Sequence, residues 1–360
     1  MTFARNISIF LIATAASFAL AQDDAQPESR RDIRYSLSVI EDATQYGNRG
    51  VPEPKILNQL LVEPYFAMHY KPDWSFASSV VGIEETYSDT VSKIRVKETY
   101  LSLSARDFDW MAGRKIVRWG TGYAFSPTGV LDPPRDPTNP TDRLNLNQGR
   151  DMVNLNYIHG PHALSLAWST AALAPSGSDL RDTTAVRYNV LTHGFDTSLI
   201  AGDDHDGDAF GGLTMTRVIG QAWELHVEAA WREHEALLSG AKYITKQGIS
   251  FIGEFYTAPN ITYFRSSSSV LSEGRLNYGF LSISKSRLRE LPEWKQWDLS
   301  ASLVTNLDDR STITIFDATR RFGKHTSGYL HMEIPAGSRT SEYGMTPYST
   351  ATSVGIRFQL

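Results

Sequence analysis

The segment Trp223-Glu224-Leu225-His226-Val227-Glu228-Ala229-Ala230-Trp231-Arg232 alternates apolar and polar side chains along almost its whole length. One face carries Leu225, Val227, Ala229 and Trp231, and the other carries Glu224, His226, Glu228, Ala230 and Arg232. A period of two predicts a strand whose two faces meet different environments. The same rhythm recurs in segments of roughly ten residues, separated by turn residues, from about Arg34 to the end of the chain.

A soluble β-sandwich would turn the polar face of such strands to water. A membrane barrel would turn the apolar face to lipid and the polar face to its lumen. The two chain ends favour the barrel. Residues 1–21 are expected to be an export signal, with Arg5, an apolar run and the cleavage pattern Ala19-Leu20-Ala21, rather than an uncleaved anchor. Residues 22–33 are expected to be a mobile lead-in.

The C-terminal segment also alternates and ends inside an amphipathic strand. Val354, Ile356, Phe358 and Leu360 share one face. This segment resembles the terminal strand of bacterial outer-membrane barrels, although the aromatic residue of that pattern lies two positions before the last residue. The alternative for this segment is an ordinary edge strand.

Composition agrees with a barrel and excludes several other classes. Aromatic residues make up 11%, which suits the aromatic girdles of barrels. Mean hydropathy is −0.29, as expected when apolar residues occupy only every second strand position. The chain has no cysteine, so it can form no disulfide and no thiolate site. Net charge is −5 and no basic stripe is present, which argues against nucleic-acid binding.

The alternation predicts an all-β fold, a single closed antiparallel transmembrane β-barrel over 34–360 with about eighteen strands (range sixteen to eighteen). The expected strands are 34–42, 57–70, 74–88, 93–104, 109–119, 152–159, 163–169, 183–190, 193–202, 207–217, 222–234, 242–256, 261–271, 275–286, 296–306, 311–320, 325–333 and 351–360.

The connections between these segments alternate in length, as they do in barrels with short periplasmic turns and long outer loops. The short series is 71–73, 105–108, 160–162, 191–192, 218–221, 257–260, 287–295 and 321–324, with Pro259-Asn260 expected as a tight turn. The other series contains the long connections 43–56, 120–151, 171–182 and 334–350. A soluble sandwich would not be expected to show this partition.

The third outer connection, 120–151, is unusually long and contains five prolines. Long loops without secondary structure are mostly functional or disordered, and the glycine and aromatic residues here argue against plain disorder. We expect this loop to fold into the lumen and narrow it; the alternative is a loop on the outer surface.

Three features around this loop resemble a known family. They are Lys97-Glu98-Thr99-Tyr100-Leu101, the segment Ala112-Gly113-Arg114-Lys115-Ile116-Val117-Arg118-Trp119-Gly120, and the Asp-Pro-rich loop that follows. They look like a largely uncharacterised porin-like group of Gram-negative outer-membrane barrels near the alginate-export and phosphate-selective porins. The match covers about 98–151, and Lys115 stands where the family commonly has Gln. The resemblance implies a barrel in the outer membrane, surrounded by lipid and lipopolysaccharide, and leaves the substrate open.

The residues near the loop are candidates for a charged constriction. Glu98 and Arg114 lie on neighbouring strands and are expected to pair, with Arg118 on the face of Arg114. Arginine is costly in lipid at mid-depth, so Arg114 is expected to point inward, with Lys115 outward unless a bulge shifts the register. The alternative is a network inside the wall that ties the loop to it. The candidates are Glu98, Tyr100, Arg114, Lys115, Arg118, Asp132, Arg135 and Asp136.

Further lumen-facing groups follow from the alternation. Those on the opening segment are Glu224, His226, Glu228 and Arg232; others are Glu63, Asp196, Asp298, Asp317, Arg187 and Arg357. Their signs are mixed, so the sequence predicts neither anion nor cation preference.

Gly202-Asp203-Asp204-His205-Asp206-Gly207-Asp208 is the single metal-like cluster of the sequence. It lacks EF-hand spacing, and a solvated turn is preferred over a Ca²⁺ site formed by Asp204, Asp206 and Asp208. Motifs for phosphate or dinucleotide binding are absent, so no cofactor is expected.

The predicted function is a passive channel for small hydrophilic solutes, and no enzymatic activity is expected. The alternatives are a barrel enzyme acting on lipid, a plugged structural or assembly barrel, and a soluble exported protein. A lipid-directed enzyme would need a nucleophile and a base on the outer wall. His226 and His234 are instead expected on the lumen face. Oligomeric state is left open.

Overall fold

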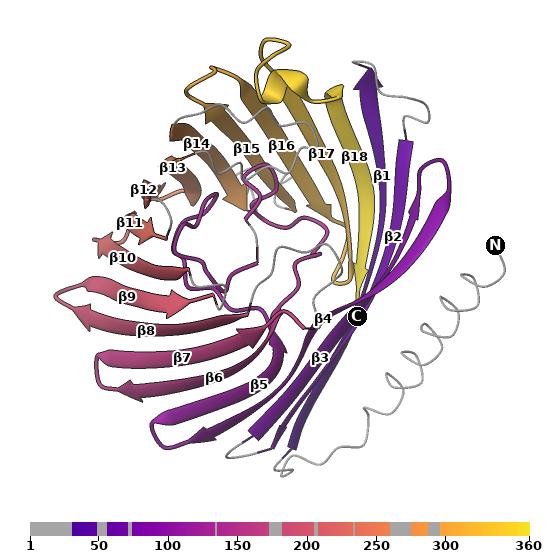
Figure 1. Cartoon of the computed structure of the whole chain (residues 1–360). Coiled ribbons are helices and arrows are strands. Elements are labelled where there is room, and N and C mark those ends of the chain that lie inside the picture. The colour runs from indigo at the N-terminus through magenta and orange to yellow at the C-terminus, as the bar shows by residue number, and fades with distance from the viewer. Residues whose placement is uncertain are drawn as a thin grey trace.

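The computed structural model describes residues 31–48, 56–70, 74–133, 135–172, 182–204, 208–232, 235–259, 275–286 and 296–360. These residues form one antiparallel sheet of eighteen strands that closes on itself (Figure 1). The strands are β1 (Arg31–Asn48), β2 (Ile56–Tyr70), β3 (Trp74–Thr86), β4 (Thr90–Ala105), β5 (Phe108–Lys115), β6 (Arg150–His159), β7 (His162–Thr170), β8 (Thr183–Thr192), β9 (Phe195–Asp203), β10 (Ala209–Ile219), β11 (Trp223–Trp231), β12 (Glu235–Ile244), β13 (Ile249–Pro259), β14 (Arg275–Ser286), β15 (Trp297–Asn306), β16 (Thr312–Arg321), β17 (Thr326–Ala336) and β18 (Tyr348–Gln359).

The barrel is closed by β1, which pairs with both β2 and β18. Residues from Ser38 to Tyr46 lie in continuous antiparallel register with Gln359 back to Ala351. The amphipathic C-terminal segment is therefore the closing strand of the sheet, and the expectation of a single closed barrel is confirmed. Closure leaves no sheet edge with unpaired backbone groups, which is the condition for a sheet to cross a membrane.

The two ends of the barrel differ in their connections. At one end, which we call the short-turn end, β4 passes to β5 through 106–107, β6 to β7 through 160–161, and β8 to β9 through 193–194. At the other, the long-loop end, β5 passes to β6 through 116–149 and β17 to β18 through 337–347. The partition of short and long connections predicted from the sequence is present.

The outer face of the barrel is apolar. Large exposed side chains lie at every second position of the strands, among them Leu225, Val227 and Trp231 on β11. Aromatic rings gather next to the short-turn end, where Trp223 packs on Tyr243 with ring centres 4.6 Å apart. An apolar belt edged by aromatic residues suits a surface that faces lipid. Among the described residues, no helix is long and apolar enough to cross a membrane.

The strand count agrees with the sequence prediction, but one part of the assignment was wrong. Residues 222–259 hold three strands, β11 to β13, where two were expected. The hairpin turn between β12 and β13 ends at Gly248, whose φ of 77° needs a residue without a Cβ. Alternation continues through this turn and concealed it. A turn was expected at 257–260, but residues 257–259 belong to β13, which ends at Pro259. The expected strand 261–271 lies outside the described residues.

Two strands also differ in extent from the prediction. The first strand was expected over 34–42, and β1 spans Arg31–Asn48. The fifth was expected over 109–119, and β5 ends at Lys115. Beyond that point the chain leaves the wall and enters the lumen, because Trp119 and Gly120 bond to Asp132 of the same loop and not to a neighbouring strand.

Candidate pore and its inner loop

Residues 116–149, which we call the inner loop, lie within the ring of strands (Figure 1). Apolar side chains fasten the loop to three separate parts of the inner wall. Phe125 joins a cluster on β12 to β16, Trp119 and Leu131 join one on β7 to β10, and Leu144 joins one on β1 to β3. The loop therefore spans the lumen and does not hang from one side.

The strongest of these apolar contacts is made by Phe125. Its side chain is fully buried and its ring stacks on Tyr256, with centres 4.9 Å apart and planes 7° from parallel. Tyr278 lies on its other flank, 5.7 Å away. A buried aromatic residue of this kind contributes about 3–5 kcal/mol when compared with alanine.

A buried carboxylate on β11 binds the backbone of the loop. Glu228 has no exposed surface. Its oxygens accept hydrogen bonds from the N–H groups of Thr121, Gly122 and Thr128 and from the hydroxyls of Thr121 and Thr128. Five donors offset the cost of burying this charge, and charge-assisted hydrogen bonds are among the stronger polar contacts in proteins.

A second carboxylate acts in the same way on β13. Glu254 accepts the N–H of Tyr123 at 2.5 Å and that of Ala124 at 2.8 Å. Nε2 of His226, from β11, lies 2.9 Å from the same carboxylate. These two side chains meet across β12 because the residue between them in the register is Gly240, where a Cβ would lie 2.2 Å from His226 Nε2.

The predicted constriction charges Asp132, Arg135 and Asp136 stabilise the loop itself. Asp132 is buried, accepts the N–H of Trp119 at 2.6 Å and lies 3.7 Å from Arg135. Burial raises the pKa of the Asp132 carboxyl. Arg135 also donates to the carbonyl of Tyr123 at 3.2 Å. Asp136 is exposed and caps the following turn. The first two therefore act as internal ties of the loop.

The far part of the loop reaches β1 and β18. Arg143 donates to Asp42 of β1 at 2.5 Å, and its guanidinium lies 5.2 Å from the ring centre of Tyr329. Arg357 of β18 donates to the carbonyl of Arg143 at 2.5 Å. Charged groups of the loop (Arg143) and of the wall (Asp42 and Arg357) therefore fix the position of this tip relative to β1 and β18.

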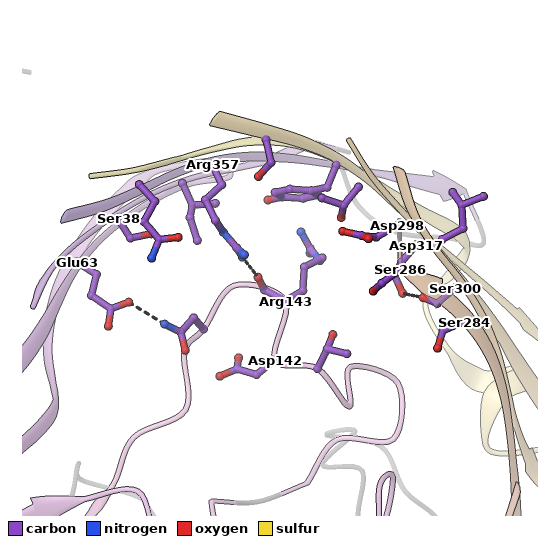
Figure 2. Close-up of a pocket in the computed structure, with 18 of the residues that line it drawn as sticks. Ser38, Glu63, Asp142, Arg143, Ser284, Ser286, Asp298, Ser300, Asp317 and Arg357 are labelled. Atoms are coloured by element: carbon purple, nitrogen blue, oxygen red, sulfur yellow. Dashed lines mark hydrogen bonds between the residues drawn. The ribbon is translucent and has the colours of Figure 1, made fainter. Parts of the chain in front are cut away.

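A cavity of about 650 Å³ lies beside this tip. Figure 2 shows Glu63 and Ser38 on one side and Asp298, Asp317 and three serines of β14 and β15 on the other, with Asp142 and Arg143 of the loop between them. The lining is hydrophilic: Ser36, Ser38, Ser284, Ser286, Ser300, Ser327, Glu63, Asp142, Asp298, Asp317, Arg143, Lys285 and Arg357 all contribute to it. The cavity lies between the tip of the loop and the inner wall of the barrel.

Several of the charges around the cavity are compensated within the wall. Glu63 bonds Lys97 and Asn145, at 2.8 and 2.9 Å. Asp298 pairs with Arg321. Asp317 bonds His331, at 2.7 Å. Both signs reach the space, in agreement with the mixed set expected from the sequence.

The predicted constriction group around β4 and β5 is partly brought together. Glu98 lies on the inner face and accepts the N–H of Ile116 at 2.8 Å. Lys115 lies over the ring of Tyr100, 4.5 Å from its centre. Arg118 is exposed at the start of the inner loop, beyond the end of β5. These contacts lie beside the base of the loop.

The predicted orientation of Arg114 and Lys115 was wrong. The register from Phe108 to Lys115 is unbroken, so Arg114 shares the outer face with the exposed Phe108 and Trp110. Thr99, and not Glu98, lies opposite Arg114. Arg114 was expected to point inward on the assumption that it lies at mid-depth in the membrane, where an arginine facing lipid is costly.

Arg114 in fact lies near the long-loop rim, where the cost of a charge facing lipid falls to about 0–1 kcal/mol. It forms a two-pronged ion pair with Asp151 of β6 on the same face, at 2.5 and 3.0 Å. Arg114 is therefore tolerated on the outer face, because it is paired with Asp151 and lies close to the membrane–water interface.

The predicted wall residues of β11 lie on the inner side. His226 and Glu228 are buried, and Glu224 accepts the hydroxyl of Tyr123 at 2.9 Å. Burial, followed by the neighbouring Glu224 carboxylate, raises the pKa of Tyr123. Arg232 follows the end of β11 and forms an ion pair with Asp204. His234 lies outside the described residues.

The metal-like cluster gives no support for a cation site. Asp204 is buried and paired with Arg232, and it accepts the N–H of Asp208 at 3.3 Å. Asp206 lies outside the described residues. In the part of the chain that the structure describes, no group of three histidine or carboxylate side chains could hold a metal ion.

Sequence reasoning missed Glu254, Lys97, Asp42 and Arg143 as members of this arrangement. Glu254 is buried and its neighbour Phe255 is exposed, so the inward direction of Glu254 could have been predicted had the β12–β13 turn been recognised. Lys97 is the extra residue at an irregularity between β3 and β4, which turns it inward. Such a shift cannot be read from alternation.

Comparison with known proteins finds solved structures that resemble this barrel. No family model matches the chain, and no curated protein matches its sequence. Solved structures do match. Pseudomonas aeruginosa OccK11 (OpdR) is 11% identical with a TM-score of 0.61, over 91% of this chain and 96% of that one. The P. aeruginosa outer membrane protein opdK is 8% identical with a TM-score of 0.61, over 91% and 98%.

Acinetobacter baumannii OccAB4 is 8% identical with a TM-score of 0.60, over 94% of this chain and 100% of that one. The chain has the fold of Gram-negative outer-membrane barrels. The likeness extends over nearly the full length of each of these proteins, so it concerns the barrel as a whole and not local hairpins alone.

Proposed function

We propose that this protein is an outer-membrane channel through which small hydrophilic solutes diffuse passively, and that the inner loop narrows its lumen. The observation that carries the proposal is a barrel with an apolar outer face and a hydrophilic cavity of about 650 Å³ beside an internal loop. An apolar exterior around a polar interior is the arrangement of channels in lipid.

The proposed passage runs between the tip of the inner loop and the inner faces of β14 to β18, β1 and β2. Apolar clusters fasten the loop to the wall at three places. Serine hydroxyls and charges of both signs line the passage. Such a lining replaces part of a solute's hydration shell at every step without holding it tightly, as conduction requires.

This location makes outer-membrane lipid and lipopolysaccharide the proposed neighbours of the apolar belt. The resemblance to the alginate-export and phosphate-selective group depends on the motif residues of 98–151 and stays a prediction. The solved structures support the broader Gram-negative outer-membrane class.

The test is planar-bilayer recording of the refolded protein. Folding is checked first by gel migration, because a closed barrel resists detergent and migrates faster unheated than boiled. We expect discrete steps of current, and faster swelling of protein-containing liposomes in small sugars than in large ones. Correctly folded protein that gives neither current steps nor swelling would refute the proposal and favour a plugged barrel.

A further inference from the structure

We infer that Glu228 and Glu254 are positioning residues that hold residues 121–128 of the inner loop against the wall, and that they contribute, together with the contacts of the tip, to the width of the passage. The consequence for conductance rests on the proposed channel function. The position of the loop can be tested without it.

Five backbone N–H groups of the loop bond to these two carboxylates. Among the described residues, the N–H groups of residues 121–124 and of Thr128 have no partner among the backbone carbonyls; they donate to the carboxylates of Glu228 and Glu254. Buried N–H groups need a partner, so this segment can stay in the barrel interior only while the two carboxylates accept its hydrogen bonds.

Glycines on the wall and on the loop leave space for these contacts. Gly240 leaves the space in which His226 touches Glu254, and a Cβ there would also lie 2.9 Å from Glu254 Cγ. On the loop side, a Cβ on Gly122 would lie 2.3 Å from the Leu238 side chain of β12. At Gly122 the loop backbone thus approaches β12 as closely as glycine allows, and on the wall Gly240 makes room for the His226–Glu254 contact.

The two carboxylates and the cavity contact different parts of the inner loop. The carboxylates act on residues 121–128, whereas the cavity is lined by residues 141–145 of the same loop, on the other side of the ring (Figure 1). Asp132 and Arg135 tie the intervening part together. Release at Glu228 and Glu254 leaves the tip held only by its own contacts, with Asp42, Arg357 and the Leu144 cluster, so the loop is fastened at fewer points and its tip is less firmly positioned.

The experiment exploits the absence of cysteine from the chain. Ser126 is buried in the clamped segment, and its hydroxyl has no hydrogen-bond partner among the described residues, so S126C introduces a protected thiol without breaking a hydrogen bond. The thiol of the folded S126C protein is labelled with a bulky water-soluble maleimide, alone and combined with E228Q and E254Q. The amide of glutamine keeps one acceptor oxygen but presents an NH2 group in place of the other, so each substitution removes one acceptor and the negative charge with little change of shape.

We expect the double substitution to speed labelling by at least about tenfold, which corresponds to about 1.4 kcal/mol. The matched control is D196N. Asp196 lies on the inner wall and bonds Asn189 of the neighbouring strand, so its substitution should leave labelling unchanged. Unchanged labelling in the folded double variant, or an equal increase in D196N, would overturn the inference.

A second pair of variants tests the same contact in case the double variant does not fold. In the S126C protein, G240A should push His226 off Glu254 and also speed labelling. G253A on the outer face, where the nearest atom would be 3.4 Å from the new Cβ, should not. Equal labelling of the folded G240A and G253A proteins would count against the clamp.

Single-channel recording then separates the two claims. The clamp variants should give larger and noisier current steps than D196N. If labelling rises but wild-type protein carries no current, the clamp stands and the channel function fails. If wild-type protein conducts but labelling and conductance are both unchanged in the clamp variants, the channel stands and the clamp fails.

Discussion

Arginine at Val227 should be one of the most destabilising single changes on the outer wall. Val227 is the fifth of the nine residues of β11, midway between Trp223 and Trp231, and it is 36% exposed on the apolar face. Its height corresponds to the middle of the apolar belt, where arginine facing lipid costs about 2–4 kcal/mol. Val227→Arg should therefore lower the free energy of unfolding by about that amount.

The measurement is urea unfolding of protein refolded into phospholipid vesicles, followed by the fluorescence of its eight tryptophans. Val227→Ala controls for lost side-chain volume and should cost less. Ser36→Arg is the control on the inner face, since Ser36 lines the hydrophilic cavity, and it should change stability by less than about 1 kcal/mol. Equal losses for Val227→Arg and Ser36→Arg would refute the assignment of the two faces.

Three other results are expected. Phe125→Ala removes the stack on Tyr256 and should weaken docking of the loop by about 3–5 kcal/mol, seen as larger, flickering current steps from a barrel of unchanged heat resistance. Deletion of Thr128 to Asn145 should raise single-channel conductance, and an unchanged value in a folded barrel would mean that this stretch does not limit the passage. Arg114→Ala and Asp151→Ala should each destabilise the barrel, and a double-mutant cycle should give a coupling of roughly 0.5–3 kcal/mol, whereas additive losses would show that the pair contributes nothing.

The sequence by itself determined the class of fold, because alternation is a local property. On β11, Leu225, Val227 and Trp231, which were assigned to the outer face, are exposed, and His226 and Glu228, which were assigned to the inner face, are buried. The closing strand was also predicted, since Val354 to Leu360 alternates up to the last residue. Lipid favours apolar side chains and the lumen favours polar ones, so neighbouring residues along a strand alternate in polarity.

Tertiary structure decided what alternation cannot encode. The direction of Arg114 depended on its height in the barrel and on Asp151, thirty-seven residues away along the chain. The clamp depended on Glu228 meeting Thr121 across 107 positions, and on Gly240 letting His226 reach Glu254. A periodic pattern fixes which face a residue takes, but only closure of the barrel around the loop determines which distant groups meet inside it.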